Sequence, residues 1–339
     1  MSGYVARIYT SADSFPPGLA THNFFHSPQF FALCKSTPRL RPYLVTAETD
    51  GGRIAGQMVA VVRHRSSWLP PFIYRHCRVL GEGVFTASDP AVPAGADASG
   101  VASDTVAEIF GIMLRALTDR IGSYMLYTEF SNLSSKMAGY RQFRECGYFP
   151  VRWMSIHNSL HSHAPEERIS ANMAKRIALA CKRGVVTVEA DGDDDFREFS
   201  RLLRRHNWTK PKRYIPADEF FRGLHGDHGR LFLTRYRGRV IGCSAVAYSQ
   251  GQAYLMYAAY RRKTYAWLHP GVHTVWNVIK TSYKRGCSHV VFMDVGLPFQ
   301  KNAFREFILR FGGKPTSTYR WFFCPVGWVN RLLSWFYRD

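Results

Sequence analysis

The sequence lacks several features that mark common protein classes. Its seven cysteines are odd in number and none stands in a Cys-x-x-Cys pair, which argues against a zinc ribbon or a disulfide framework. It contains no G-x-S-x-G motif and no Walker loop, so nothing supports a hydrolase or an NTPase. It has no run of about 20 apolar residues, and residues 1–13 have no apolar core of the signal-peptide kind. These absences predict a cytoplasmic protein in a reducing compartment.

Acidic side chains are scarce. Against 25 Asp and Glu stand 45 Lys and Arg, which give a formal net charge of +20. The basic residues are spread along the chain, so we expect a basic face or groove that attracts a negatively charged partner. The candidates are RNA, an anionic membrane surface and a phosphate-rich substrate or cofactor; DNA is not expected. Charge alone does not choose among them.

The order of expected elements repeats along the 339 residues, a length that suits two domains. The first half predicts strands, a helix and a further strand at 43–48, 54–63, 104–122 and 124–130. The second half predicts the same order at 231–236, 240–248, 253–259, 271–285 and 289–295. Even the hairpin turns match, GRIAG at 52–56 and GRVIG at 238–242. We therefore expect an α/β (α+β) protein made by tandem duplication, with mixed central sheets and domains at 1–160 and 161–339.

Three segments resemble the FemAB-like branch of the GNAT superfamily, the peptidoglycan bridge-forming aminoacyltransferases and their relatives. They are HSPQFF at 26–31, the basic helix 173–183 followed by Gly184-Val185, and FMDVG at 292–296 with the later Phe311-Gly312-Gly313. The resemblance implies two GNAT-like acyltransferase domains. It also implies transfer of an acyl or aminoacyl group to an amine or hydroxyl of a cell-envelope or other phosphorylated acceptor.

The resemblance implies acyl-CoA or aminoacyl-tRNA as a co-substrate, with no tightly bound cofactor. Members that use tRNA often carry a long helical arm, and residues 185–236 predict only a short helix and a loop. This difference leaves room for acyl-CoA. The second hypothesis, from another class, is a non-catalytic basic module that binds RNA or anionic lipid.

A basic loop follows a predicted strand and precedes a predicted helix. It contains Arg261, Arg262 and Lys263. In CoA-using GNAT domains this position holds a Gly-rich loop that binds pyrophosphate, and here Thr264 and Ala266 replace the glycines. The three cations are therefore expected to hold donor phosphates by charge. A solvated basic loop is the alternative interpretation.

The remaining candidate site residues also lie mainly in the second half. We expect substrate contacts from Arg213 and Tyr214 in the loop Pro211-Lys212-Arg213-Tyr214, and from Tyr257 in the aromatic-rich segment 254–267. Asp294 ends an apolar strand and is the catalytic candidate, as a group that positions or deprotonates the acceptor amine. A structural cap at Gly296 is the alternative.

Three further basic residues complete the predicted substrate set. Lys301 and Arg305 follow Asp294 closely and are candidates to pair with it. For Lys35, the resemblance implies a contact to the nucleotide part of the acceptor, and an ordinary surface lysine is the alternative. The second domain therefore carries the expected active site, and the first is expected to shape the acceptor side.

Two other segments allow a functional and a structural interpretation. His157, His161 and His163 have metal-ligand spacing, but no Cys or carboxylate partner is evident, so no metal is expected. The tail 327–338 places Trp, Leu and Phe on one broad helical face, which suits either a helix in a membrane interface or one docked on the protein's own core. The first alternative predicts peripheral contact with the inner membrane surface.

Overall fold

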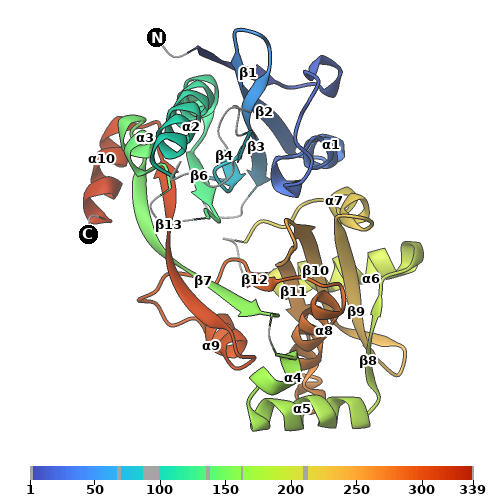
Figure 1. Ribbon diagram of the computed structural model, residues 1–339. Coiled ribbons are helices and arrows are strands. Elements are labelled where there is room, and N and C mark those ends of the chain that lie inside the picture. Colours follow the sequence, from blue (N-terminus) through green and yellow to red (C-terminus); the bar gives the residue numbers. More distant parts are fainter. Residues whose placement is uncertain are drawn as a thin grey trace. The chain divides into compact units, whose positions relative to one another are not determined.

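The computed structural model describes residues 3–66, 70–86, 99–134, 138–161, 163–208 and 213–337. The chain forms two compact units, Met1–Trp153 with Thr318–Asp339, and Met154–Ser317 (Figure 1). It passes from the first unit to the second within β7 (Phe149–Ser159) and returns within β13 (Lys314–Phe323). The C-terminal segment thus lies in the unit that contains the N-terminus, which differs from the expected boundary at residue 160.

The first unit is a mixed sheet with helices packed on it. Its strands, in sheet order, are β1 (Tyr4–Tyr9), β2 (Leu40–Thr49), β3 (Ile54–Ser66), β4 (Ile73–Leu80), β6 (Tyr127–Ser131) and β13, and β5 (Val84–Phe85) pairs with β3. Its helices are α1 (Pro28–Ser36), α2 (Ser99–Ile121), α3 (Tyr140–Glu145) and α10 (Gly327–Phe336), with short 3-10 turns at Ala12–Ser14, Phe24–His26 and Gly122–Tyr124. Neighbouring strands are antiparallel except β4 and β6, which are parallel.

The second unit repeats this plan. Its strands are β8 (Val185–Glu189), β9 (Gly229–Tyr236), β10 (Arg239–Ser249), β11 (Gln252–Tyr260), β12 (His289–Phe292) and β7, in that order in the sheet. Its helices are α4 (Pro165–Arg168), α5 (Ala171–Lys182), α6 (Gly192–Asn207), α7 (Asp218–Leu224), α8 (Pro270–Lys284) and α9 (Ala303–Leu309), with a 3-10 turn at Ala266–Leu268. Here β11 and β12 form the parallel pair.

Each repeat ends in a strand that completes the sheet of the other unit. Strand β7 follows α3 of the first repeat, but its residues 156–159 pair with β12. Strand β13 follows α9 of the second repeat, but its residues 321–323 pair with β6. The predicted tandem duplication with mixed sheets is confirmed, and this exchange accounts for the unit boundary at 153 rather than 160.

Helices cover both faces of the second sheet. Consecutive strand residues point to opposite faces, and in β10 Gly242 faces Thr274 of α8 while the Cys243 thiol faces the Phe199 carbonyl of α6. On the α8 side, Val272, Val275 and Ile279 join Leu255 and Phe292 in one apolar cluster. Within the described ranges, no helix combines the length and the hydrophobicity needed to cross a bilayer.

Candidate functional site

Strand β11 contains a bulge at the point where its parallel neighbour ends. Ala245 of β10 pairs with Tyr257 and Val246 with Leu255, so Met256 is an extra residue in β11. Pairing with β12 covers only residues 252–255 of β11. Beyond Leu255, no described strand pairs with β11 on that side. The two parallel strands therefore part at the bulge.

The first unit does not open in this way. There β4 pairs with β6 through Leu80, which is the last residue of β4. Two copies of one plan therefore differ at the place where the second copy parts its central strands. This difference singles out the second unit as the place to look for a site.

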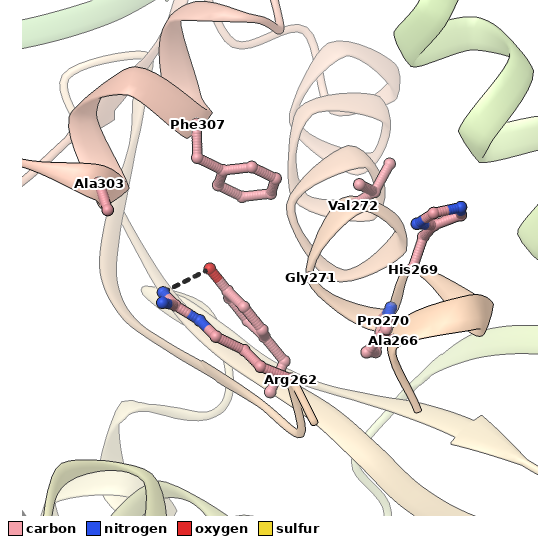
Figure 2. Close-up of a pocket in the computed structure, with 9 residues that line it drawn as sticks. Arg262, Ala266, His269, Pro270, Gly271, Val272, Ala303 and Phe307 are labelled. Atoms are coloured by element: carbon pink, nitrogen blue, oxygen red, sulfur yellow. Dashed lines mark hydrogen bonds between the residues drawn. The ribbon is translucent and has the colours of Figure 1, made fainter. Parts of the chain in front are cut away.

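A cavity of about 310 Å³ lies at the end of β11. Figure 2 shows Arg262, His269 and Phe307 around it, on the loop after β11, at the start of α8 and on α9 respectively. Its full lining is Tyr260, Arg262, Ala266, His269, Pro270, Gly271, Val272, Ala303 and Phe307. Most of these residues are apolar or aromatic, and the rings of Tyr260 and Phe307 lie 6.0 Å apart. Arg262 and His269 make one side of the cavity basic.

The first turn of α8 faces this cavity. Pro270 stands at the start of the helix and has no N–H, so the first-turn donors nearest the cavity are the amides of Gly271 and Val272. A Cβ on Gly271 would lie 2.7 Å from the Tyr260 ring, which means that only glycine lets the helix approach the strand this closely. A helix N-terminus that lines a cavity favours an anion such as a phosphate.

Basic side chains surround the cavity rim. Arg262 donates a hydrogen bond of 3.2 Å from Nη2 to the Tyr260 hydroxyl, and its guanidinium lies 5.2 Å from the centre of that ring. Burial, and then the positive charges of Arg176 and Arg183, lower the pKa of His269. The rim therefore has a positive potential even where the imidazole is neutral. Arg261 and Lys263 are exposed and are not among the lining residues.

Arg213, Tyr214 and Tyr257 come together at the bulge, and their predicted role in substrate binding stays a prediction. Arg213 donates from Nη2 to the Met256 carbonyl at 3.2 Å, and its guanidinium lies 5.5 Å from the centre of the Tyr257 ring. The Tyr257 hydroxyl donates to the Tyr214 carbonyl at 3.3 Å. Arg213 Nε is buried and has no hydrogen-bond partner within the described part of the chain. Pro211 and Lys212 of the predicted loop lie outside the described residues.

Asp294 lies two residues beyond the end of β12. It is half-buried and has a left-handed backbone, with φ of 62°. Arg305, a predicted partner, donates to two carbonyls of the loop after Asp294, to Leu297 at 2.6 Å and to Gln300 at 2.5 Å. Lys301 is exposed. The arrangement fixes the loop after Asp294, and the predicted roles of these residues stay predictions.

The remaining candidates lie elsewhere. Lys35 is exposed on α1 of the first unit and donates to the Thr10 carbonyl at 3.0 Å, and its predicted contact to a nucleotide stays a prediction. The rings of His157 and His161 pack against His289 at 5.3 and 4.9 Å, and His163 contacts Glu167 at 3.1 Å. Among the described residues, no group of three or more His, Cys, Asp or Glu is placed to hold a metal.

Residues 168–301 match the acetyltransferase (GNAT) domain family. The chain carries a GNAT acyltransferase domain. The bulge, the start of α8 and Asp294 all lie inside the matched segment, so the candidate site belongs to the GNAT domain. The prediction of an acyltransferase is confirmed by this match. No curated protein sequence matches the chain significantly.

Solved structures extend the GNAT fold to the whole chain. The crystal structure of FemX has a TM-score of 0.61 at 11% sequence identity and covers 92% of this chain and 94% of that one. The C-terminal domain of a putative lysylphosphatidylglycerol synthetase from Agrobacterium fabrum has a TM-score of 0.57 at 8% identity, over 92% and 91% of the chains. A tandem GNAT protein from the clavulanic acid biosynthesis pathway has a TM-score of 0.50 at 12% identity, over 86% and 85%. At these identities the likeness shows the fold, and it confirms the expected tandem arrangement of two GNAT-like domains.

Sequence reasoning missed several residues of the candidate site. The bulge at Met256 and the cavity residues His269, Gly271 and Phe307 were not among its candidates. His269-Pro270-Gly271 carries a usable signal, because Pro at the first position of a helix marks the N-terminus where an anion binds. The bulge has no comparable signal, since it exists only in the pairing of β10 with β11.

Proposed function

We propose that the second unit transfers an acyl group from a CoA thioester to an amine, or a hydroxyl, of a phosphorylated cell-envelope acceptor. One observation carries this proposal. The parallel strands β11 and β12 part at the Met256 bulge, and a cavity at the end of the same strand β11 is lined by the first turn of α8. A donor with a phosphate end and a reactive carbonyl end fits such a slot.

The donor's phosphate end is assigned to the basic rim of the cavity. Arg262 and the amides of Gly271 and Val272 line the cavity and supply donors to phosphate oxygens. Arg261 and Lys263 stand beside Arg262 in the sequence and add positive charge from the solvent side. The loop lacks the glycines of a backbone cradle, so charge carries more of the binding here. Aminoacyl-tRNA is the second donor that this chemistry admits.

The acceptor is assigned to the group around the bulge. The Arg213 guanidinium attracts a phosphate or carboxylate, and Nε is a buried donor suited to one of its oxygens. Tyr214 and Tyr257 flank it with aromatic surface. One of the matched structures is named as part of a putative lysylphosphatidylglycerol synthetase, a name that refers to a phospholipid carrying a lysyl group. We extend that class of acceptor to this chain, together with contact at the inner membrane surface.

The chemistry proceeds by direct attack. The nitrogen lone pair of the acceptor amine attacks the acyl carbonyl carbon, the C–N bond forms, and the C–S bond of the thioester breaks. The amine proton passes to the Asp294 carboxylate, and the departing thiolate takes up a proton to leave as free CoA. The protein contributes alignment of the two substrates and positive charge near the developing oxyanion.

A thermal-shift screen with mass-spectrometric detection of acyl transfer tests the proposal. CoA thioesters, aminoacyl-tRNA and nucleotide-linked sugars are compared as ligands of the full chain. We expect CoA thioesters to raise Tm, and Arg262→Ala to reduce that rise while Arg201→Ala, at an exposed arginine of α6, does not. Stabilisation by none of these ligands, with no transfer to any amine, would contradict the proposal.

A further inference from the structure

The C-terminal helix α10 exposes an apolar face. Trp328, Leu332, Trp335 and Phe336 are 67%, 54%, 68% and 69% exposed. Their spacing of four, three and one residues places them on one side of a helix. None of the residues of α10 is buried. The helix therefore does not use these four side chains to dock on its own unit.

A polar side chain holds the helix in this orientation. Asn330 Oδ1 accepts a hydrogen bond from the Cys324 amide, and Asn330 Nδ2 donates to the Gly147 carbonyl, both at 2.9 Å. The Tyr337 ring stacks on Phe149 at 6.3 Å, with an angle of 9° between the rings. Both anchors are in the first unit, where α10 lies beside α3 (Figure 1). Because Asn330, Tyr337 and the half-buried Val329 and Leu333 face the protein, the tryptophans face outward.

The charge around this face suits an anionic surface. Residues 321–337 contain one basic side chain, Arg331, and no Asp or Glu. Arg331 is exposed, as is Arg144 in the last turn of α3, where Glu145 is paired with Arg141 at 2.8 Å. A tryptophan near each end of the helix fits the interfacial layer of a bilayer, where an indole ring lies in apolar surroundings and its N–H reaches polar groups.

We propose that α10 lies flat in the interfacial layer of an anionic phospholipid membrane. Trp328, Leu332, Trp335 and Phe336 enter among the upper acyl chains, and Arg331 lies at the level of the lipid phosphates. A helix of this length extends about 15 Å, which is about half of what a span requires, so it rests on the membrane and does not cross it. The proposal goes beyond the transfer reaction, because docking does not depend on which acyl group moves.

A second copy of the chain is a poorer occupant of the face. In a twofold dimer the same patch meets itself, so each Arg331 would face a second copy of residues 321–337, which contain no carboxylate, while Glu145 of the neighbouring α3 is already paired with Arg141. A membrane that contains phosphatidylglycerol offers apolar chains and phosphates together. The one feature that disfavours the dimer therefore favours the lipid surface.

Vesicle flotation with the full chain tests the proposal. Vesicles of phosphatidylethanolamine with phosphatidylglycerol are compared with vesicles of phosphatidylcholine alone. We expect the wild type to float mainly with the anionic vesicles, and Trp328→Ala/Trp335→Ala to lower the partition coefficient by about tenfold or more. The matched control is Trp208→Ala, which removes a tryptophan that is 84% exposed at the end of α6 and should leave flotation unchanged.

A charge-reversal variant keeps the test decisive if the double variant loses its fold. Arg331→Glu leaves the apolar face and Asn330 in place, so it should keep the wild-type Tm and lose binding to anionic vesicles. Unchanged flotation of folded Arg331→Glu, or of the folded double variant, would overturn the proposal. So would a lipid-free dimer in sedimentation velocity that Trp328→Ala/Trp335→Ala converts to a monomer. Because CoA binding is measured without lipid, failure of docking is distinguishable from failure of the proposed function.

Discussion

Arg213 donates a hydrogen bond of 3.2 Å to the carbonyl oxygen of Met256, the extra residue in the bulge of β11. The bond joins the segment after α6 to the place where β11 and β12 part. A cation that is expected to hold the acceptor therefore lies at the opening that is expected to hold the reacting carbonyl. Affinity for the acceptor and alignment of the reaction should depend on the same side chain.

The activity should consequently depend on the shape of the side chain at position 213 as well as on its charge. Arg213→Lys keeps the charge but loses the planar fork, so kcat/KM for the acceptor should fall about tenfold, and Arg213→Gln should lower it about a hundredfold. Steady-state kinetics with varied acceptor measures this. Arg205→Gln, at an exposed position of α6, is the control, and an equal loss there would remove the specific role of Arg213.

Arg262 and Arg261 allow a neighbouring comparison at the donor rim. Both are basic loop residues, but only Arg262 lines the cavity. Arg262→Ala should weaken CoA binding about tenfold, since it removes a charge-assisted contact to phosphate, while Arg261→Ala removes only long-range attraction and should cost less. Calorimetric titration at two salt concentrations separates the effects. A larger loss for Arg261→Ala would place the donor phosphates on the outer side of the loop.

Gly271 is expected to be intolerant of even one methyl group. Its Cβ would lie 2.7 Å from the Tyr260 ring, so Gly271→Ala should push α8 away from β11, lower the unfolding free energy by about 1–3 kcal/mol and weaken donor binding. Gly327→Ala is the matched control, because a Cβ there meets nothing within 4 Å. Chemical denaturation measures both variants. Equal stability of Gly271→Ala and Gly327→Ala would show that α8 and β11 can accommodate a methyl group at position 271.

Asp294→Asn should separate chemistry from folding. The amide keeps the shape of the side chain but takes up no proton, so kcat should fall about a hundredfold while Tm changes little. Single-turnover rates with a saturating acceptor report the chemical step. Full activity of Asp294→Asn would leave the residue with a structural role in the turn before Gly296.

His26 should make stability depend on pH. Burial lowers its pKa from 6.5 to about 4, and its Nδ1 accepts a hydrogen bond from the Val59 amide at 3.1 Å. Below about pH 6.5 the unfolded chain takes up a proton that the folded chain takes up only near pH 4, so the unfolding free energy falls as pH drops through this window, by up to about 3 kcal/mol.

Denaturation near pH 7 and near pH 5 checks the sign and the source of this effect. His26→Gln should show a smaller loss between the two conditions than the wild type, whereas His22→Gln, at an exposed position, should lose as much as the wild type. Some slope should persist in His26→Gln, because burial and three nearby arginines also lower the pKa of His76, to about 2. An identical slope in His26→Gln would refute the assignment.

Local patterns gave the elements of the site closely. The helix expected at 271–285 is α8, Pro270–Lys284, because its apolar period and the Gly286 stop are local signals. The strand expected at 289–295 ends at Phe292, since the backbone turns to a left-handed φ at Asp294. The strand was expected to continue to Val295 because Met293 and Val295 are apolar, and no residue type there predicted the left-handed backbone at Asp294.

Features that depend on contacts between distant residues could not be predicted from the sequence. The exchange of β7 and β13 between the units depends on strand pairing across more than a hundred residues, and no local pattern encodes it. The orientation of α10 also follows from a distant contact, the bond from Asn330 to Gly147. Amphipathicity indicated that the helix has an apolar face, but not that Trp328 and Trp335 point away from the protein.

Hydrogen–deuterium exchange of the full chain, with and without a CoA thioester, tests the central claim most directly. The claim is that the donor lies between the end of β11 and the first turn of α8. We predict slower exchange in peptides that cover residues 256–272 and 303–307, with little change around β4 and β6 of the first unit. Unchanged exchange in those peptides at saturating CoA thioester, or protection confined to the first unit, would contradict the account.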